Sequence, residues 1–375
     1  MKYMGSKRSM LLNGLGETIQ KAIPGHTRFI DMFSGSGSVS WHVANKYSIP
    51  VLAADLQFFS VALAEGVLSR THEEEYSVLE DWIFRAAQYL EQDHNLAEAK
   101  VIQGHINDKS ISGVALSARA LSAEGNGPIN KAYGGYYYST LQSMWLDALR
   151  ATLPVSIGSK AICQASLIWA ASSCAASPGH TAQPFKPNET AGRFLADSWK
   201  KSIPHYVTSA FGKINGITAK RIGTAVQQDA NELALMLKEG DLAFLDPPYS
   251  GVHYSRFYHV LETLVINERV EVSGSGRYPP PEARPKSKYS MMGTSTDALK
   301  RVLSALSEVG ANAIITFPAG KASNGLSGDQ VKEIAATYYK IKFEKVSGRF
   351  STLGGNSRNR NARAASEELI LVLQN

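Results

Sequence analysis

The sequence predicts an α/β protein in which a parallel sheet of the nucleotide-binding type is interrupted by a largely helical insertion. Three observations support this fold class. A strand, a glycine turn and a helix follow one another over residues 28–47, and a second strand over residues 51–55 ends in an acid. Far downstream, the apolar run 242–245 predicts a short buried strand that also ends in an acid, Asp246.

The glycine turn and the acid after it indicate a nucleoside site. Gly35 and Gly37 follow the first strand, which carries Asp31 and leads into Phe33, and their missing Cβ atoms let a ligand approach the backbone. Asp55 lies 18 residues after Gly37, close to the spacing of about 20 at which a carboxylate binds ribose hydroxyls. The pattern is G-x-G-x-x-S, which indicates little by itself. A helix-capping aspartate is the alternative for Asp55.

Asp246 is followed at once by Pro247, Pro248 and Tyr249. Neither proline can donate a backbone hydrogen bond and each fixes its own φ, so the backbone is stiff and its carbonyl groups are left free. A carboxylate, an exposed carbonyl and a flat ring at a strand end form a site that could hold a planar amine. The alternative is a strand that ends in a proline turn with an aspartate cap.

Two other charged residues have more than one interpretation. Lys7 stands at the start of an amphipathic helix that we expect to end near Pro24-Gly25, and a solvated lysine is the simplest interpretation of it. Asp229 ends a strand-like run over 224–229 and precedes a helix over 231–238. It either caps that helix or faces the adenine edge of a cofactor.

Residues 71–219 predict an inserted, mostly helical domain, whereas residues 1–70 and 220–375 predict the domain that contains the sheet. The aromatic cluster over 133–138 is either a base-stacking surface or part of the packing. The low-charge stretch 161–177 predicts a buried helix and not a membrane span. Cys163 has no preceding proline, and we interpret it as a packing residue and not as a nucleophile.

The composition favours an intracellular protein with a polyanionic partner. The net charge is +6 and the isoelectric point is about 9.1, a mild basicity that suits nucleic acid. Two cysteines form neither a metal cluster nor a disulfide framework, so no metal is expected. The first residues lack the apolar core of an export signal. We therefore expect a soluble, cytoplasmic protein without a membrane partner.

Three segments are candidates for nucleic-acid contacts. Residues 249–259 are dense in aromatic and basic side chains, residues 273–290 predict a mobile basic loop, and a polar basic loop over 354–363 precedes a terminal strand. A solvated hairpin tip is the alternative for the last of these. The candidate residues are Tyr249, Tyr254, Arg256, Lys286, Lys288, Arg358 and Arg360.

In this order, the motifs resemble those of the Dam-like adenine-N6 DNA methyltransferases, in which a target-recognition domain lies between the cofactor motifs and the catalytic motif. The stretch 3–7 looks like the family's N-terminal motif, 33–38 is similar to its glycine loop, and 246–249 match its Asp-Pro-Pro-Tyr motif. The resemblance covers about residues 1–65 and 220–375. Met32 stands where a proline is usual, and Ala230 where a phenylalanine often follows the upstream acid.

The resemblance implies a Rossmann-like methyltransferase sheet and methyl transfer from S-adenosylmethionine to a flipped-out adenine at specific sites in double-stranded DNA. It implies catalytic roles for Asp246 and Pro247, which would bind the amine, and for Tyr249, which would stack on the base. A restriction or defence partner and a bacterial, archaeal or phage source are compatible with it. The residues implied in cofactor binding are Tyr3, Lys7, Asp31, Phe33, Gly35, Gly37, Asp55, Asp229 and Asp246.

Two alternatives stay open. The chain could methylate RNA or another planar amine or amide, although Asp246 favours adenine because protein-glutamine methylases resemble an Asn-Pro-Pro-Tyr pattern. It could also be a catalytically silent nucleic-acid-binding protein of the same fold. A binding module has no need of Gly35, Gly37, Asp55 and the 246–249 motif together, which disfavours that alternative.

Overall fold

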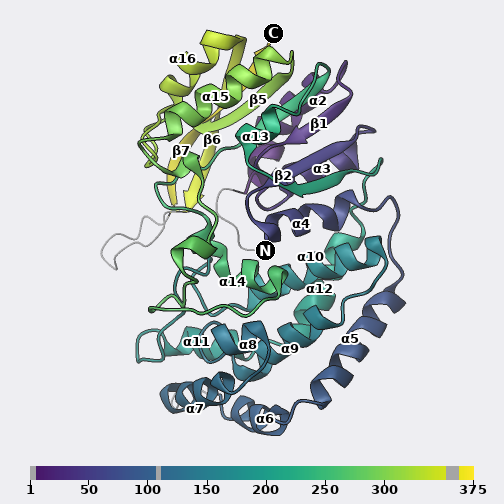
Figure 1. The fold of residues 1–375 in the computed structure, drawn as a ribbon, viewed down its shortest axis with the longest axis vertical. Coiled ribbons are helices and arrows are strands. Elements are labelled where there is room, and N and C mark those ends of the chain that lie inside the picture. Colours follow the sequence, from purple (N-terminus) through teal and green to yellow (C-terminus); the bar gives the residue numbers. More distant parts are fainter. Residues whose placement is uncertain (1–5, 107–110, 352–362) are drawn as a thin grey trace. The chain divides into compact units, whose positions relative to one another are not determined.

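The computed structural model describes residues 6–106, 111–351 and 363–375, which form two compact units (Figure 1). The sheet unit lies within Met4–Leu56, Ala219–Tyr254 and Lys286–Asn375. The helical unit lies within Gln57–Thr218 and Ser255–Pro285. The chain therefore crosses from one unit to the other several times.

The sheet unit contains a seven-stranded sheet in the order β3-β2-β1-β4-β5-β7-β6, which confirms the predicted α/β methyltransferase fold class. Strands β1 to β5 pair in parallel, and β7 pairs antiparallel with β5 and β6. The strands are β1 Arg28–Asp31, β2 Val51–Asp55, β3 Thr224–Gln227, β4 Asp241–Leu245, β5 Asn312–Pro318, β6 Lys340–Ser351 and β7 Arg363–Gln374.

Helices bury both faces of this sheet. Ile30, Leu245 and Ile315 belong to the core beneath α13 (Ala230–Ala234), α15 (Ser295–Glu308) and α16 (Gly328–Tyr338). Their neighbours along the strands point to the opposite face, where the rings of Phe29 and Phe244 stack with centroids 6.2 Å apart. Helix α3 (Ser38–Lys46) contacts β1 and β2. Strand β4 is buried along its whole length, as expected for a parallel strand covered on both faces.

The strand order brings the carboxyl ends of β1, β2 and β4 together. The chain runs outward from β1 through β2 to β3, whereas β4 and β5 extend the sheet on the other side of β1. Such a reversal marks the crevice in which open α/β sheets bind their ligands. Asp31 and Asp55 end β1 and β2, and Asp246 follows β4 directly. The three acids predicted to bind ligands therefore belong to neighbouring strands.

The predicted N-terminal helix is found, but it is not continuous. It comprises α1 (Arg8–Met10), the turn η1 (Leu11–Leu15) and α2 (Gly16–Ala22), and it ends just before Pro24. Asn13 and Gly14 leave the helical conformation, and Gly14 adopts a φ of +100°. Glycine is suited to this kink because it has no Cβ atom, and a positive φ therefore causes no steric clash.

The predicted terminal strand is found as β7, but the sequence did not predict β6 beside it. Charged side chains such as Lys340, Lys342 and Glu344 recur along β6, so it lacks the apolar pattern of a buried strand. Its pairing with β7 defines it, and its place at the end of the sheet explains its polarity. The predicted basic loop over 354–363 lies almost wholly outside the described residues.

The helical unit confirms that the middle of the chain is mostly helical. The predicted buried helix is α10, which packs against α4 and α12 and buries Cys163 and Cys174, neither of which forms a disulfide within the described residues. Burial raises the pKa of the Cys163 thiol, which makes it a poor nucleophile. The helices are α4 Phe58–Leu68, α5 Tyr76–Glu91, α6 Leu96–Gly104, α7 Ile111–Ala123, α8 Pro128–Tyr133, α9 Thr140–Ala151, α10 Ile157–Cys174, α11 Gly192–Trp199, α12 Ile203–Asn215 and α14 Ser255–Ile266.

The helical unit is larger than the predicted insertion over 71–219. It also contains α4 and the segment 255–285, which the sequence assigned to the sheet domain. The reason is packing: a Cβ atom on Gly66 of α4 would lie 2.5 Å from that of Ala165 in α10, so the two helices are in close contact. Helix α14 packs against α4 and α8 in turn. That this unit recognises the target stays a prediction.

Three tyrosines of the 133–138 cluster pack inside the helical unit. Tyr133, Tyr137 and Tyr138 are fully buried, and their hydroxyls bond to Thr263, to the Gly276 carbonyl and to the Ala171 carbonyl. Of the two interpretations of this cluster, packing holds for these three side chains. Tyr136 is partly exposed.

The segment 273–290 is not a uniform loop. It contains the short 3-10 helices η2 (Pro281–Ala283) and η3 (Lys288–Ser290), and Tyr289 is buried. Among the described residues, no helix is both long enough and apolar enough to cross a membrane.

Candidate active site

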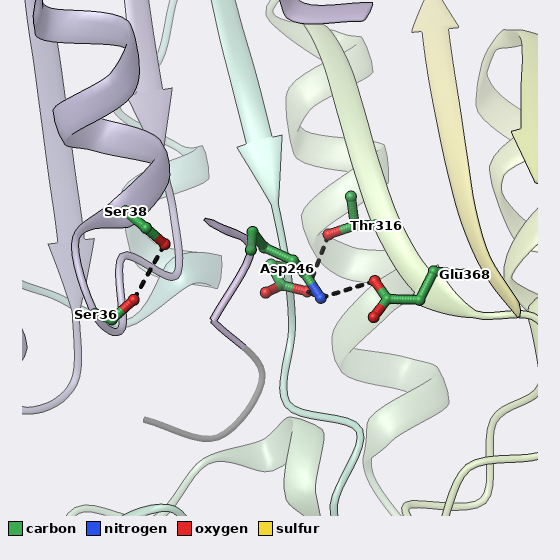
Figure 2. A network of polar contacts seen from close by, with 6 residues as sticks. Ser36, Ser38, Asp246, Thr316 and Glu368 are labelled. Atoms are coloured by element: carbon green, nitrogen blue, oxygen red, sulfur yellow. Dashed lines mark hydrogen bonds and ion pairs between the residues drawn. The ribbon is translucent and has the colours of Figure 1, made fainter. Parts of the chain in front are cut away.

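The glycine turn holds one of the acids by a backbone bond. Gly35 and Gly37 adopt φ values of +48° and +72°, in the region that favours glycine. The backbone N–H of Gly35 donates to Asp55 Oδ2 at 2.9 Å. In the same turn the hydroxyls of Ser36 and Ser38 lie 3.1 Å apart (Figure 2). The carboxylate that the sequence assigns to a ribose is therefore tied to the turn.

Asp31 is the most deeply buried of the three acids. Its side chain accepts a hydrogen bond of 2.5 Å from the Ser40 hydroxyl. Burial raises the pKa of Asp31 to about 7; the Ser40 hydrogen bond opposes this rise, and the Asp246 and Asp55 carboxylates add to it. Three mutually repelling carboxylates at one sheet edge favour a ligand that carries positive charge or hydrogen-bond donors.

Asp246 is held on one side only. Its Oδ1 atom lies 3.0 Å from Lys7 Nζ and accepts a hydrogen bond of 2.9 Å from the Thr316 hydroxyl on β5 (Figure 2). Within the described residues no partner of Oδ2 is found, and the side chain is 16% exposed. Burial raises the pKa of Asp246 to about 6; the Lys7 ammonium opposes the rise and the Glu368 carboxylate adds to it. One carboxylate oxygen is thus positioned and the other is open.

Lys7 bridges two carboxylates. Its ammonium group also donates to Glu368 Oε2 on β7 at 3.0 Å. Lys7 is only 4% exposed, so the interpretation of a solvated lysine is wrong. Burial alone would lower the pKa of Lys7, but the Asp246 and Glu368 carboxylates outweigh burial and raise it. The ammonium group therefore stays charged and links the N-terminal segment to the end of β4 and to the middle of β7.

The loop after Asp246 is fixed by a buried asparagine. Asn324 donates through Nδ2 to the carbonyls of Pro248 and Tyr289, each at 3.0 Å, and its backbone N–H donates to the Tyr249 carbonyl. In the described part of the chain the carbonyl of Pro247 has no hydrogen bond. This carbonyl and the Oδ2 atom of the preceding residue are therefore two open acceptors on adjacent residues.

An aromatic pair completes the site. The Tyr249 ring meets the Phe317 ring edge-on at 6.4 Å, and Lys7 Nζ lies 5.7 Å from its centroid. Burial raises the pKa of Tyr254, and the neighbouring Tyr249 and Asp246 raise it further. Both predicted tyrosines are therefore close to the open carboxylate.

Two predicted cofactor residues take part in local structure. Asp229 accepts a hydrogen bond of 2.9 Å from the Asn231 N–H and caps α13, so the capping interpretation is confirmed. Its contact with a cofactor adenine stays a prediction. Phe33 meets Tyr289 edge-on at 5.0 Å. Met32 donates its backbone N–H to Phe244, a bond that the proline usual at this position could not make.

The predicted nucleic-acid residues are distributed over both units. Lys286 and Lys288 are exposed on the sheet unit, whereas Arg256 is exposed on α14 of the helical unit. Tyr3, Arg358 and Arg360 lie outside the described residues. Metal ligands are not clustered either: within the described ranges, no group of three or more His, Cys, Asp or Glu side chains could hold an ion.

Sequence reasoning missed three residues that organise the site: Thr316, Asn324 and Glu368. Thr316 is the polar residue in the apolar run 313–317, and Glu368 directly precedes the apolar run of β7. A lone polar residue in an apolar run is a signal that could have identified Thr316, whereas Glu368 follows Ser366 and Glu367 and does not stand out in this way. Asn324 lies in a loop, and nothing in the sequence marks its burial.

The amino-acid sequence of the chain matches the sequence model of one protein family. The sequence model of the D12 class N6 adenine-specific DNA methyltransferases matches residues 3–137 and 213–311, more than half of the chain. The match includes the glycine turn, Asp55 and the 246–249 motif. It also extends over 66–137, which the motifs by themselves left unmatched.

Several curated relatives are modification methylases. Modification methylase StsI of Streptococcus sanguinis is 26% identical over 278 residues, which are 73% of this chain and 37% of the relative. Modification methylase LlaI of Lactococcus lactis subsp. lactis is 23% identical over 293 residues, 73% of this chain and 40% of the relative. Type II methyltransferase M.FokI of Planomicrobium okeanokoites is 24% identical over 282 residues, which are 73% of this chain and 38% of the relative. The chain thus spans about two fifths of the length of these relatives.

Proposed function

The chain belongs to the D12 class N6 adenine-specific DNA methyltransferase family, and we propose that it transfers a methyl group from S-adenosylmethionine to the N6 amine of adenine in double-stranded DNA. One observation supports this most strongly. Asp246 is anchored through Oδ1 by Lys7 and Thr316, whereas Oδ2 and the adjacent Pro247 carbonyl have no hydrogen-bond partner among the described residues. Two fixed acceptors side by side fit the two N–H groups of an exocyclic amine.

These acceptors address the difficulty of the reaction. The adenine N6 lone pair is delocalised into the ring, which makes the amine a poor nucleophile. Hydrogen bonds from its two N–H groups to Asp246 Oδ2 and the Pro247 carbonyl favour a pyramidal nitrogen and stabilise the positive charge that develops on it. Tyr249 stacks on the base, which contributes about 1–3 kcal/mol. The amine proton is lost after transfer, and no covalent enzyme intermediate is needed.

The sheet edge fits the methyl donor. When bound, S-adenosylmethionine supplies a sulfonium whose methyl group is transferred, and the Asp31, Asp55 and Asp246 carboxylates provide an electrostatic environment that suits a cation. Asp55 would bind the ribose, and Gly35 and Gly37 leave room for the ligand beside the backbone. Tyr3, Lys7, Phe33 and Asp229 would complete this site.

DNA binding involves further proposals. The target amine cannot be reached within a duplex, so the adenine has to be flipped out at a cost of a few kcal/mol. We assign target recognition to the helical unit, whose middle, residues 138–212, lies outside the family match. Tyr254, Arg256, Lys286, Lys288, Arg358 and Arg360 would contact the nucleic acid. The named modification methylases make a cognate restriction enzyme a natural partner.

A direct experiment distinguishes this function from its alternatives. The purified protein is incubated with methyl-labelled S-adenosylmethionine and duplex DNA, single-stranded RNA or a glutamine peptide, and the nucleic acids are digested to nucleosides. We expect labelled N6-methyl-2′-deoxyadenosine from the DNA substrate and no label in the RNA or the peptide. Label recovered only from RNA or peptide would contradict the proposed substrate, and no label in any of them would favour a silent binding protein.

Asp55→Ala is expected to weaken binding of the methyl donor. The substitution removes a charged hydrogen-bond acceptor, and such bonds contribute about 1.5–3 kcal/mol, or roughly 10- to 150-fold in Kd. Titration calorimetry with S-adenosylmethionine measures the change. Asp329→Ala removes a fully exposed carboxylate paired with Lys332 in the same unit and should leave Kd unchanged. Equal Kd values for wild type and Asp55→Ala would remove Asp55 from the ribose role.

Methyl transfer is expected to fall as the pH is lowered through about 6. The folded protein holds the pKa of Asp246 at about 6, and the ionised carboxylate stabilises the positive charge that develops on the amine, whereas a neutral carboxyl group does not. At about pH 5, one unit below that pKa, the single-turnover rate should be roughly tenfold below its plateau. Rapid-quench measurements with DNA prebound between pH 5 and 8 check this. A rate independent of pH over that range would rule out a titrating Asp246.

A further inference from the structure

A partly exposed tyrosine of the helical unit, Tyr136, lies close to two arginines. The Arg119 guanidinium lies 4.4 Å from the centroid of the Tyr136 ring, and the Arg277 guanidinium lies 4.5 Å from it. Arg119 comes from α7 and Arg277 from the segment after α14, so residues far apart in sequence meet at one ring. All three side chains are partly exposed, unlike the buried tyrosines on either side of Tyr136.

The backbone is shaped to form this stack. Gly135 adopts a φ of +74°, and a Cβ atom there would lie 2.6 Å from the Arg119 side chain. Arg119 Nε donates to the Gly135 carbonyl at 3.0 Å, and Arg277 Nε donates to the Ala132 carbonyl at 2.9 Å. Arg277 itself has a φ of +54°, a conformation that costs energy for a residue with a side chain. Both guanidinium groups are therefore held in place before any ligand binds.

Tyr278, the residue after Arg277, repeats the arrangement with two other arginines. The Arg256 and Arg284 guanidinium groups lie 4.9 and 5.6 Å from the centroid of the Tyr278 ring. The Nε atom of Arg284 is buried and has no hydrogen-bond partner within the described chain. A buried N–H donor without an acceptor is costly, and it indicates a missing acceptor.

The four arginines also lack neutralising partners. Within the described ranges none of them forms an ion pair, whereas Arg85 pairs with Asp81 in the same unit. A cavity of about 350 Å³ beside Arg277 adds the cations Lys131 and Arg269, with Glu271 as the acid in its lining. Fixed, unpaired guanidinium groups leave their forked donors available, and such forks match phosphate oxygens.

We propose that Arg119, Arg277, Arg256 and Arg284, held on Tyr136 and Tyr278, bind the phosphate backbone of DNA. The proposal rests on the function proposed above, which makes DNA the polyanion concerned. Stacking on the rings fixes each guanidinium, and the Nη donors that form no backbone bond remain for phosphate oxygens, so the contact is independent of base sequence. The surface would orient the duplex and leave base discrimination to other residues.

The test is the double variant Arg119→Gln/Arg277→Gln. Fluorescence anisotropy with labelled duplexes is expected to show binding weakened about 10- to 100-fold, equally for duplexes of unrelated sequence. Each lost phosphate contact lowers the slope of log K against log salt by about 0.9, so a decrease of about 1.8 is expected for two. If the variant does not fold, as judged by its melting temperature, Arg256→Gln/Arg284→Gln carries the same expectation.

Arg193→Gln is the matched control. Arg193 lies 4.5 Å from the Phe194 ring of the same unit, so it is also a stacked, exposed arginine but lies outside the two stacks. Its replacement should leave affinity and salt slope unchanged. Folded double variants that bind like wild type would overturn the phosphate surface, as would an equal loss in the control. Wild type that binds DNA through these arginines yet transfers no methyl group would overturn the proposed activity and leave the surface standing.

Discussion

Asp246→Ala is expected to reduce methyl transfer by at least about 100- to 1,000-fold while the protein still folds. The variant loses the carboxylate oxygen that we propose accepts from the amine, and loss of a single preorganised group that stabilises developing charge has this size. Single-turnover transfer of labelled methyl groups to DNA measures it. Circular dichroism and calorimetry with S-adenosylmethionine should show that folding and donor binding survive.

Two further substitutions sharpen this result. Asp246→Asn keeps the shape and an oxygen for Lys7 and Thr316, but it points an NH₂ group towards the amine, where donor faces donor. We expect it to be almost as inactive as the alanine variant. Asp329→Ala, on an exposed carboxylate of the same unit, should keep full activity. An Asp246→Ala protein with wild-type transfer rates would show that the catalytic assignment is wrong.

Lys7→Met is expected to destabilise the protein by about 3–5 kcal/mol near pH 8. Its ammonium lies between the Asp246 and Glu368 carboxylates, and removing one partner of a buried ionic group leaves uncompensated charge. Without Lys7, which opposes the rise, the pKa of Asp246 in the folded state should be higher still. The penalty is present above that pKa and is lost as the pH falls through it, because the carboxyl group becomes neutral. Urea unfolding at about pH 5.5 and 8 measures the difference.

Lys7→Met/Glu368→Gln tests whether the pair, and not only its parts, stabilises the fold. The double variant removes one charge of each sign and leaves Asp246 as the single carboxylate of the group. It should be more stable at about pH 8 than Lys7→Met, with an interaction energy of about 0.5–3 kcal/mol in the double-mutant cycle. Strictly additive effects of the two substitutions would contradict direct coupling between Lys7 and Glu368.

Local sequence patterns were sufficient to predict the elements that carry the acids at the carboxyl ends of the strands. The predicted strand over 51–55 coincides with β2, and the glycine turn appears where Gly35 and Gly37 predict it, because positive φ and the absence of Cβ are properties of single residues. The run 242–245 is buried throughout, as its apolar composition indicates. In contrast, β6 was missed because its pairing partner, and not its own pattern, makes it a strand.

The sequence by itself determined the family, the type of sheet and the identity of the acids at the strand ends, because these depend on motifs with local backbone requirements. Only the tertiary structure decided that Lys7 is buried between Asp246 and Glu368, residues more than 100 positions apart along the chain. It also decided that Asn324 fixes the loop after Asp246 and that the arginines gather on Tyr136 and Tyr278. The sequence alone does not indicate whether the side chain of a charged residue is solvated or buried. The packing of distant segments around that side chain determines its partners.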